Sequence, residues 1–419
     1  MAMQPEIAAA TYRAPTALGR AARLLSPGAA AAGRVALSRD RRQRLHRLAT
    51  VVGDAWQQRR HPQRPRMQSL VVSHRGQVRW HDTAIPPLPG PAGAVVSPIA
   101  MATCDLDRPL ALGSAPFPLP LHLGHECVAE VLTVGESVTR VTPGDRVVVP
   151  FQISCGECTA CRHGLTGNCR AVPPISMYGF GVAGGAWGGA FSEQLAVPYA
   201  DAMLVPLPAG VDPVTVASAG DTLSDAYRHI APNLDLIRGQ PDEPRIIILG
   251  AIDQRSQFSG SVPLYAGQIA QALIPEASTL IFDGRPWVRQ HAARLGLEAY
   301  PPNNLRGLTA PLVLDSSAHP RGLVLALRST SPDGLCSCAG SLHARSTIPS
   351  ALMFGRNVTV SVARSHVRTA IAAVLELVAA GRIHPEAVTT TVGAFRDAAS
   401  VISSHLTTPD TKTILVRAT

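Results

Sequence analysis

The chain has 419 residues, of which 46% are hydrophobic and 4% aromatic, and its formal net charge is +9. This length predicts two or three domains, and the hydrophobic fraction excludes a wholly disordered chain. No run of about 18 uninterrupted apolar residues occurs, so we expect no membrane-spanning helix and no membrane partner.

The positive charge is concentrated at the N-terminus. Residues 1–66 contain 13 arginines and three acidic residues, whereas residues 67–419 contain 25 basic and 26 acidic residues. A near-neutral body lacks the electrostatic footprint of nucleic-acid binding, so we expect no nucleic-acid partner. We interpret residues 1–66 as a disordered Arg/Ala-rich extension or the product of translation begun upstream of Met67, with an organellar transit peptide as the alternative. Deleting this segment is then expected to leave fold and activity intact.

Short valine-rich strands separated by Pro and Gly follow from Met67 onward. They are expected at Ser69–Val72, Val95–Ile99, Cys127–Val134 and Arg146–Pro150. This pattern predicts a compact, mostly β domain that ends near Asp221.

Beyond Asp221, strands alternate with helices. Strands are expected at Arg245–Leu249, Thr279–Asp283, Pro311–Asp315 and Leu335–Ala339, with helices at Tyr265–Ile274, Pro286–Leu295 and Pro320–Leu327. This alternation is typical of a parallel, doubly wound sheet. A helix at Thr369–Ala380 and a strand at Thr413–Val416 complete the pattern.

Four of the eight cysteines lie within fifteen residues of one another: Cys155, Cys158, Cys161 and Cys169. Four thiolates form a closed tetrahedral shell, which favours a structural zinc over the alternatives of an iron–sulfur cluster or free thiols. The N-terminus has no apolar segment typical of a secretory signal. Clustered cysteines without such a signal indicate metal ligands in a cytoplasmic protein rather than disulfides.

A second group of residues has the chemistry of a catalytic metal site. Cys104 lies 21 residues before His125, in the sequence Gly124-His125-Glu126. A catalytic zinc needs about three protein ligands and one exchangeable position, and Cys104 and His125 can supply two of them.

The stretch GHECVAEVLTVGESVTRVTPGDRVVVP begins at Gly124 and runs directly into the four-cysteine segment. With the cysteine before it and the alternating strands after it, this order resembles the medium-chain zinc-dependent alcohol dehydrogenase superfamily over Met67–Thr419. The segment from Tyr178 to Asp201, which includes Trp187-Gly-Gly, is similar to glutathione-independent formaldehyde dehydrogenases.

This resemblance implies an α/β fold with a GroES-like, mostly β catalytic domain and a Rossmann-like, doubly wound cofactor domain. The catalytic domain with its structural zinc lobe is expected at residues 67–221, and the cofactor domain at residues 222–355. Residues 356–419 are expected to return to the catalytic domain.

The resemblance also implies roles for individual residues. Cys104, His125 and Asp221 match the catalytic zinc ligands, and Glu126 matches a glutamate behind the metal that can exchange with its water. Asp107 matches a carboxylate that orients the histidine ligand, with a turn residue or helix cap as the alternative. The chain would then hold two zinc ions, one catalytic and one structural.

Two residues beside Cys104 depart from the family pattern. The family usually has Ser or Thr two residues after the catalytic cysteine to pass the alcohol proton outward, and Leu106 cannot do so. Asp105 stands where the family often has Arg, His or Gly. We hypothesise that Asp105, Thr222 or Ser224 takes over proton transfer through water.

The expected nucleotide-binding turn lacks the usual run of glycines. The strand Arg245–Leu249 ends at Gly250, and after a polar loop Gly260-Ser-Val262 precedes Pro263, which stands where the last glycine belongs. A turn between strand and helix lets a pyrophosphate approach backbone amides. Gly250, Gly260 and Val262 are therefore the candidate pyrophosphate contacts.

Asp283 follows the second strand, where an acid accepts hydrogen bonds from ribose hydroxyls. This position favours NAD, and the nearby Arg285 leaves NADP open. The alternative is that Asp283 caps the helix that begins at Pro286.

The sequence therefore predicts a zinc-dependent enzyme that transfers a hydride between an alcohol or aldehyde and NAD or NADP. Homo-oligomerisation to a dimer or tetramer is expected from the family. One alternative is a degenerate or tightly cofactor-bound member with little turnover. Another is a non-enzymatic zinc module with an Arg-rich nucleic-acid tail, which would hold one zinc rather than two.

Overall fold

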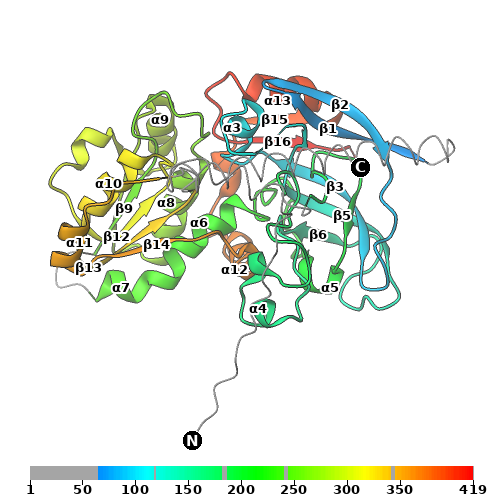
Figure 1. Ribbon diagram of the computed structural model, residues 1–419, viewed down its shortest axis with the longest axis horizontal. Helices are drawn as coiled ribbons and strands as arrows, with labels where there is room; N and C mark the ends of the chain where they lie inside the picture. Colours follow the sequence, from blue (N-terminus) through cyan, green and yellow to red (C-terminus); the bar gives the residue numbers. More distant parts are fainter. Residues whose placement is uncertain (1–64, 118, 182–185, 240–243, 341–344, 419) are drawn as a thin grey trace, which may run out of the picture.

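The computed structural model describes residues 65–117, 119–181, 186–239, 244–340 and 345–418. Two lobes lie side by side, one built on a seven-stranded sheet and the other on a six-stranded sheet (Figure 1). The predicted N-terminal extension lies outside the described residues except for its last two positions, and the first strand begins at Arg66. No helix in these described ranges is both long enough and apolar enough to cross a membrane.

The first lobe contains a mostly antiparallel sheet in the order β15-β16-β3-β5-β6-β8, with β7 also paired to β3. Its strands are β3 (Ala94–Ala102), β5 (Glu126–Val134), β6 (Arg146–Val149), β7 (Leu195–Val197), β8 (Val205–Pro206), β15 (Thr391–Ala394) and β16 (Thr413–Val416). Alternate residues of β6 serve two cores, since Val147 and Val149 face one cluster and Val148 the other. The valine-rich pattern is therefore that of strands buried on both faces.

A three-stranded antiparallel sheet, β2-β1-β4, covers this lobe. It consists of β1 (Arg66–His74), β2 (Gln77–Ala84) and β4 (Leu121–His122). The strand β2 was not predicted because only Val78 and Trp80 interrupt its polar residues before Ala84. Its position is fixed by pairing with β1.

The second lobe contains a fully parallel sheet in the order β11-β10-β9-β12-β13-β14. Its strands are β9 (Arg245–Leu249), β10 (Ser278–Phe282), β11 (Glu298–Tyr300), β12 (Ala310–Asp315), β13 (Thr330–Cys338) and β14 (Thr359–Val362). Counted along the chain, this is the 3-2-1-4-5-6 order of dinucleotide-binding folds. The predicted fold class, with a mostly β domain and a Rossmann-like domain, is confirmed.

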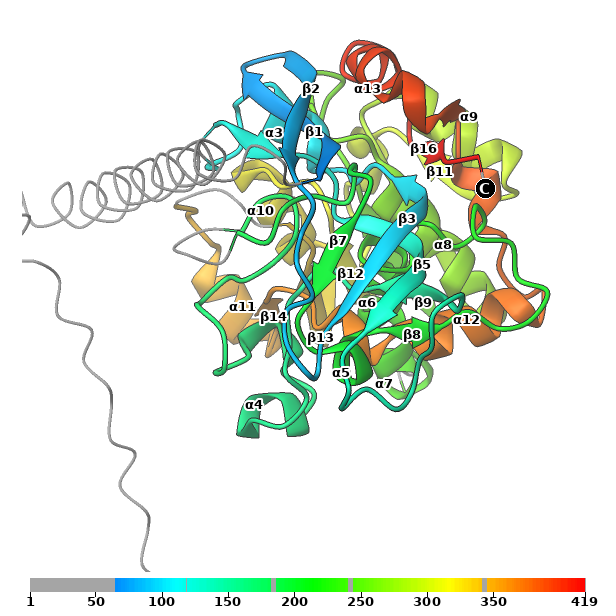
Figure 2. The same ribbon diagram turned by 90° about the vertical axis from the view of Figure 1, so that its right-hand side faces the viewer.

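Helices pack on both lobes (Figure 2). In chain order they are α3 (Asp107–Ala111), α4 (Thr159–Arg162), α5 (Ala200–Met203), α6 (Thr222–Ile230), α7 (Leu234–Arg238), α8 (Ser261–Leu273), α9 (Pro286–Arg294), α10 (Pro320–Arg328), α11 (Ser350–Arg356), α12 (Ile371–Ala379) and α13 (Ala398–His405). Single 3-10 turns lie at Thr166–Asn168, Ala231–Asn233, Pro302–Leu305, Val367–Thr369, Pro385–Val388 and Phe395–Asp397.

Several element limits differ from the sequence expectation: strand β13, for example, begins at Thr330 rather than Leu335. Two further differences concern the second lobe. Helix α8 begins at Ser261 rather than Tyr265, because Gly260 adopts φ +96° and Pro263 is accommodated in the first helical turn. Strand β14 pairs with β13, so the six-stranded sheet extends to Val362, beyond the boundary expected at residue 355. The remaining domain limits stay predictions.

Candidate functional site

Four side chains with metal-binding atoms converge between the two lobes: Cys104, His125, Glu126 and Asp221. Their candidate ligand atoms all lie within 4.8 Å of one another, and each residue is buried. They come from the loop after β3, the start of β5 and the residue before α6. The structure thus brings together the three predicted zinc ligands and the predicted glutamate.

Strand pairing explains how residues so far apart in sequence meet. Ala102 at the end of β3 is paired with Glu126 at the start of β5, which places the flanking Cys104 and His125 together. Gly124 has φ +88°, and a Cβ there would lie 2.6 Å from the Phe191 ring, so only glycine fits before His125.

The His125 imidazole is buried, and neither ring nitrogen has a hydrogen-bond partner among the described residues. Its Nε2 lies 3.3 Å from a carboxylate oxygen of Asp221, and its Nδ1 lies 3.6 Å from one of Asp107. Asp107 is itself fixed by the backbone amide of Cys104, which donates to it at 2.8 Å. A buried imidazole without hydrogen bonds, facing a thiol and a carboxylate, fits a metal ligand oriented by Asp107.

Glu126 is held by partners that the sequence analysis did not identify. Its Oε1 accepts from the backbone amide of Thr222 at 2.9 Å and also from the Thr222 hydroxyl. Its Oε2 accepts from the Lys412 ammonium at 3.0 Å, and both side chains are fully buried. Lys412 is the only lysine in this arginine-rich chain, and this unusual residue choice is the feature of the sequence that could have marked it as a site residue.

The electrostatics of the cluster favour a cation. Burial, together with Asp221 and Glu126, raises the pKa of the Cys104 thiol well above its ordinary value. Burial lowers the pKa of His125, but Asp107 and Asp221 outweigh it and raise that pKa to about 9. Burial also raises the pKa of Glu126 to about 7. Several acidic groups packed together in low dielectric are relieved by a bound metal cation, and S, N and O donors suit zinc.

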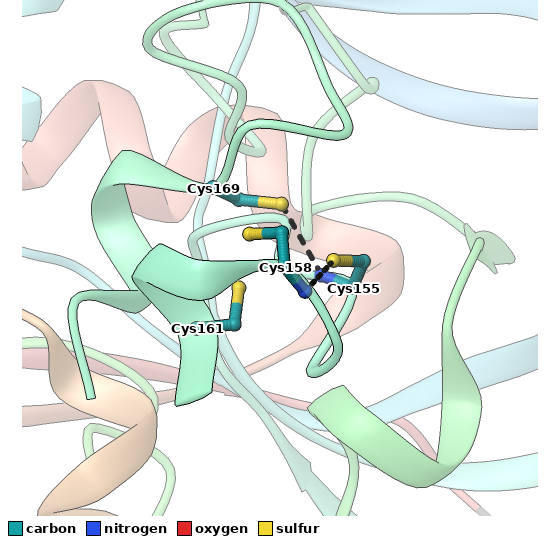
Figure 3. A group of neighbouring side chains, drawn as sticks. All are labelled: Cys155, Cys158, Cys161 and Cys169. Carbon is teal, nitrogen blue, oxygen red and sulfur yellow. Dashed lines mark hydrogen bonds between the residues drawn. The ribbon is translucent and has the colours of Figure 1, made fainter. Parts of the chain in front are cut away.

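The second predicted metal group lies in the segment around α4. The side chains of Cys155, Cys158, Cys161 and Cys169 point toward one another (Figure 3), and their sulfur atoms lie within 4.8 Å of one another. Backbone amides donate to these sulfurs, including that of Arg170 to Cys158 at 3.4 Å. This contact is the main cause that lowers the pKa of Cys158 to about 6. The residues fit a closed four-thiolate zinc site.

Comparison with known proteins gives the same family from sequence and from structure. Residues 90–209 match the alcohol dehydrogenase GroES-like domain. The structure is similar to the alcohol dehydrogenase TADH from Thermus sp. ATN1, with a TM-score of 0.73 and 30% identity over 84% of this chain and 100% of that one. The chain belongs to the medium-chain zinc-dependent alcohol dehydrogenase superfamily.

Two curated relatives add detail. A Mycobacterium tuberculosis protein named as a probable zinc-binding alcohol dehydrogenase is 28% identical over 78% of this chain and 82% of its own length. A glutathione-independent formaldehyde dehydrogenase of Pseudomonas aeruginosa is 32% identical, over 49% of this chain and 50% of its own length.

The structure separates the three candidates for the dehydrogenase proton relay. Asp105 directs its carboxylate to the N-terminus of α8, and the Ser224 hydroxyl donates to the Ala219 carbonyl at 2.6 Å. Thr222 instead contacts both Glu126 and Lys412 beside the metal cluster. Of the three, only Thr222 is hydrogen-bonded to a member of that cluster in the described structure.

The predicted cofactor residues lie together at the carboxyl ends of β9 and β10, but their polar groups are engaged. Asp283 is fully buried, and its carboxylate accepts from Arg285 at 2.6 and 2.8 Å and from the Ala251 amide at 3.2 Å. A Cβ on Gly250 would lie 2.1 Å from Asp283, and one on Gly260 would lie 2.7 Å from Arg285. Asp283 therefore forms a buried ion pair and does not cap α9, whose N-cap is Arg285.

Proposed function

We propose that the chain is a zinc-dependent oxidoreductase that exchanges a hydride between an alcohol or aldehyde and NAD(P). One observation carries this proposal: Cys104, His125 and Asp221 converge in a buried cluster, and the His125 nitrogens have no hydrogen-bond partner among the described residues. Three such residues would hold a catalytic zinc and would leave it able to bind a substrate oxygen.

Cys104, His125 and Asp221 would hold a zinc ion, which when bound would supply Lewis acidity toward the oxygen of an alcohol or aldehyde. The protein holds its own groups in place for this chemistry. Asp107 lies 3.6 Å from Nδ1 of His125, on the side of the ring away from Asp221, where it would orient the imidazole. Glu126, the fourth member of the cluster, is held by Thr222 and Lys412, which both donate to its carboxylate.

We propose that the Thr222 hydroxyl passes the alcohol proton outward. In the family a Ser or Thr at the position of Leu106 usually does this. The Thr222 hydroxyl contacts the Glu126 carboxylate and accepts from the Lys412 ammonium at 3.3 Å. Replacing it in Thr222→Val removes the hydroxyl while keeping the branched shape. We expect this variant to change the pH dependence of kcat, whereas Ser224→Ala should leave that profile unchanged.

Metal content tests the site independently of substrate. We propose two zinc ions per chain, so His125→Ala and Cys158→Ser should each retain one. The first variant should lose activity with its zinc, because it removes a ligand of the reacting metal. A wild-type protein that binds a single zinc, lost only in Cys158→Ser, would exclude the catalytic site.

A panel of alcohols and aldehydes tests the reaction, with NAD and NADP supplied separately and the reduced nicotinamide followed by absorbance. One alternative is a family member with little turnover. The Asp283–Arg285 ion pair favours it, because this pair packs against Gly250 and Gly260 of the expected nucleotide-binding turn. Two zinc ions without reduction of either nucleotide on any substrate would support this alternative.

Self-association is a further part of the proposal. On the edge of the six-stranded sheet, Val362 of β14 is 59% exposed, and Phe354 of α11 is 89% exposed. Exposed apolar side chains beside an unpaired edge strand favour contact with a second copy. Light scattering should give a dimer or tetramer, and Phe354→Asp should shift it toward the monomer.

A further inference from the structure

In folds with this strand order, the pyrophosphate of a dinucleotide binds at the N-terminus of the helix that corresponds to α8. Strand β9 is the first strand of the 3-2-1-4-5-6 order, and α8 is the helix that follows it. In such folds the first amides of that helix bind the phosphate oxygens. Here those amides belong to Gly260, Ser261 and Val262.

These donors already bind an anion that belongs to the chain. The Asp105 carboxylate accepts from the amides of Gly260 at 3.0 Å, Ser261 at 2.8 Å and Val262 at 3.4 Å. The Ser261 hydroxyl donates to it at 2.6 Å. Asp105 comes from the other lobe, 155 positions earlier in the sequence, and is 8% exposed.

The surroundings are also those of an anion site. The buried guanidinium groups of Arg108 and Arg285 both lie within electrostatic range of the Asp105 carboxylate. Arg285 is further held by Asp283 and by the Phe258 carbonyl. Three amides and a hydroxyl thus donate to a single carboxylate, and two cations contribute to the electrostatic field around it.

A pyrophosphate does not fit on these amides while Asp105 occupies them. The two anions would compete for the same N–H groups, and like charges at this distance repel each other in a site with little water. Binding a dinucleotide therefore requires the carboxylate to leave its charge-assisted hydrogen bonds, which are about twice as strong as neutral ones.

We propose that Asp105 is an intramolecular competitor of NAD(P), whose carboxylate holds the pyrophosphate position of α8 and so weakens dinucleotide binding. The proposal rests on the proposed function, because it takes a dinucleotide as the hydride partner. It adds an autoinhibitory contact between the first lobe, which contains Asp105, and the second lobe, which contains α8. Opening this contact is the step that admits the nucleotide.

The test compares NADH and NADPH binding, by nucleotide fluorescence and calorimetry, to the zinc-loaded wild-type chain and two variants. Asp105→Asn keeps the shape and removes the charge, and Asp105→Ala removes the whole group. Both should bind nucleotide roughly tenfold more tightly, or better. The matched control is Asp397→Asn, which removes an equal charge from a side chain that is 56% exposed, in the same lobe as Asp105 and outside the nucleotide-binding turn, and should leave the affinity unchanged. Equal affinities for wild type and both folded Asp105 variants would overturn the proposal.

A second measurement needs no variant. The first amides of a helix have no acceptor within the helix and ordinarily exchange quickly. Hydrogen exchange of the wild-type peptide that covers Ser261 and Val262 should show protection without nucleotide, because Asp105 accepts from both. Rapid exchange there would refute the contact.

Failure of the proposed function has a different signature. A cobalt-substituted catalytic site changes its absorption when an alcohol or aldehyde oxygen binds, whether or not nucleotide is present. A spectrum that does not respond to any substrate would count against the zinc oxidoreductase. A responsive spectrum with unaltered nucleotide affinity would count against Asp105 alone.

Discussion

Replacing Lys412 tests whether the buried contact with Glu126 supports the catalytic cluster. The Lys412 ammonium donates to Glu126 at 3.0 Å, to the Thr222 hydroxyl at 3.3 Å and to the Thr103 carbonyl, and both charged side chains are fully buried. Burial lowers the pKa of Lys412, but Glu126 outweighs it and raises that pKa above its ordinary value.

Lys412→Met keeps the length of the side chain and removes the charge. It leaves the Glu126 carboxylate buried without its cation and the Thr103 carbonyl without its donor. Loss of one partner of a buried pair costs about 3–5 kcal/mol of unfolding free energy, and we expect that loss in the metal-free protein. The cost should be smaller in the zinc-loaded protein, because the metal also compensates Glu126.

Urea unfolding of four proteins measures the interaction free energy between Lys412 and Glu126. The four proteins are the wild type, Lys412→Met, Glu126→Gln and the double variant. The double variant should be more stable than the sum of the single losses predicts, by about 1.5 kcal/mol or more, because neither charge is left alone. Arg396→Met is the matched control, since it removes a cation that is 88% exposed and should change stability by less than about 0.5 kcal/mol. Additive losses, or a Lys412→Met loss below about 1 kcal/mol, would refute the reasoning.

Three further predictions concern the metals and the backbone. Zinc binding at the catalytic cluster should release protons, and it should weaken as the pH falls from 9 to 6. The reason is that the pKa in the metal-free protein is about 9 for His125 and about 7 for Glu126. Calorimetric heats of zinc binding that do not depend on the ionisation enthalpy of the buffer would contradict this prediction. In the metal-free protein, the raised pKa of His125 contributes stability that is complete below pH 6.5 and lost as the pH rises through about 9, which urea unfolding across this range measures. Gly124→Ala should destabilise by more than about 1 kcal/mol in thermal unfolding, because φ is +88° and the new Cβ meets Phe191. Gly144→Ala is its control: φ is +95° but nothing lies within 4 Å, so a comparable loss there would assign the effect to backbone strain alone.

The sequence predicted the longer apolar strands of both lobes because their signals are local, but it did not predict the shorter strands β4, β7, β8, β11, β14 and β15. The run Arg245–Leu249 is almost wholly apolar and forms β9 with the same limits, and Thr413–Val416 likewise forms β16. Strand β2 was missed because its residues are mostly polar and only pairing with β1 fixes it. The start of α8 was placed four residues late, because a positive φ at Gly260 and a proline in the first turn disguise it.

The candidate metal groups were predicted for two different reasons. The four cysteines lie within fifteen residues, so their spacing alone indicates a shared ion. Cys104, His125 and Asp221 are separated in the chain and were found through their match to the family order. The structure adds that their ligand atoms converge.

The sequence by itself determined the fold class, the family and the residue types of the two candidate metal sites, because these depend on periodicity, short spacing and motif order. Only the tertiary structure decided how the charges are partnered. The contacts of Asp105 with α8 and of Lys412 with Glu126 join positions 155 and 286 residues apart, with Asp105 and α8 in different lobes. Such pairings depend on how the lobes and strands pack, and no local pattern encodes them. The packing of the two lobes buries Asp105 and places its carboxylate on the first amides of α8.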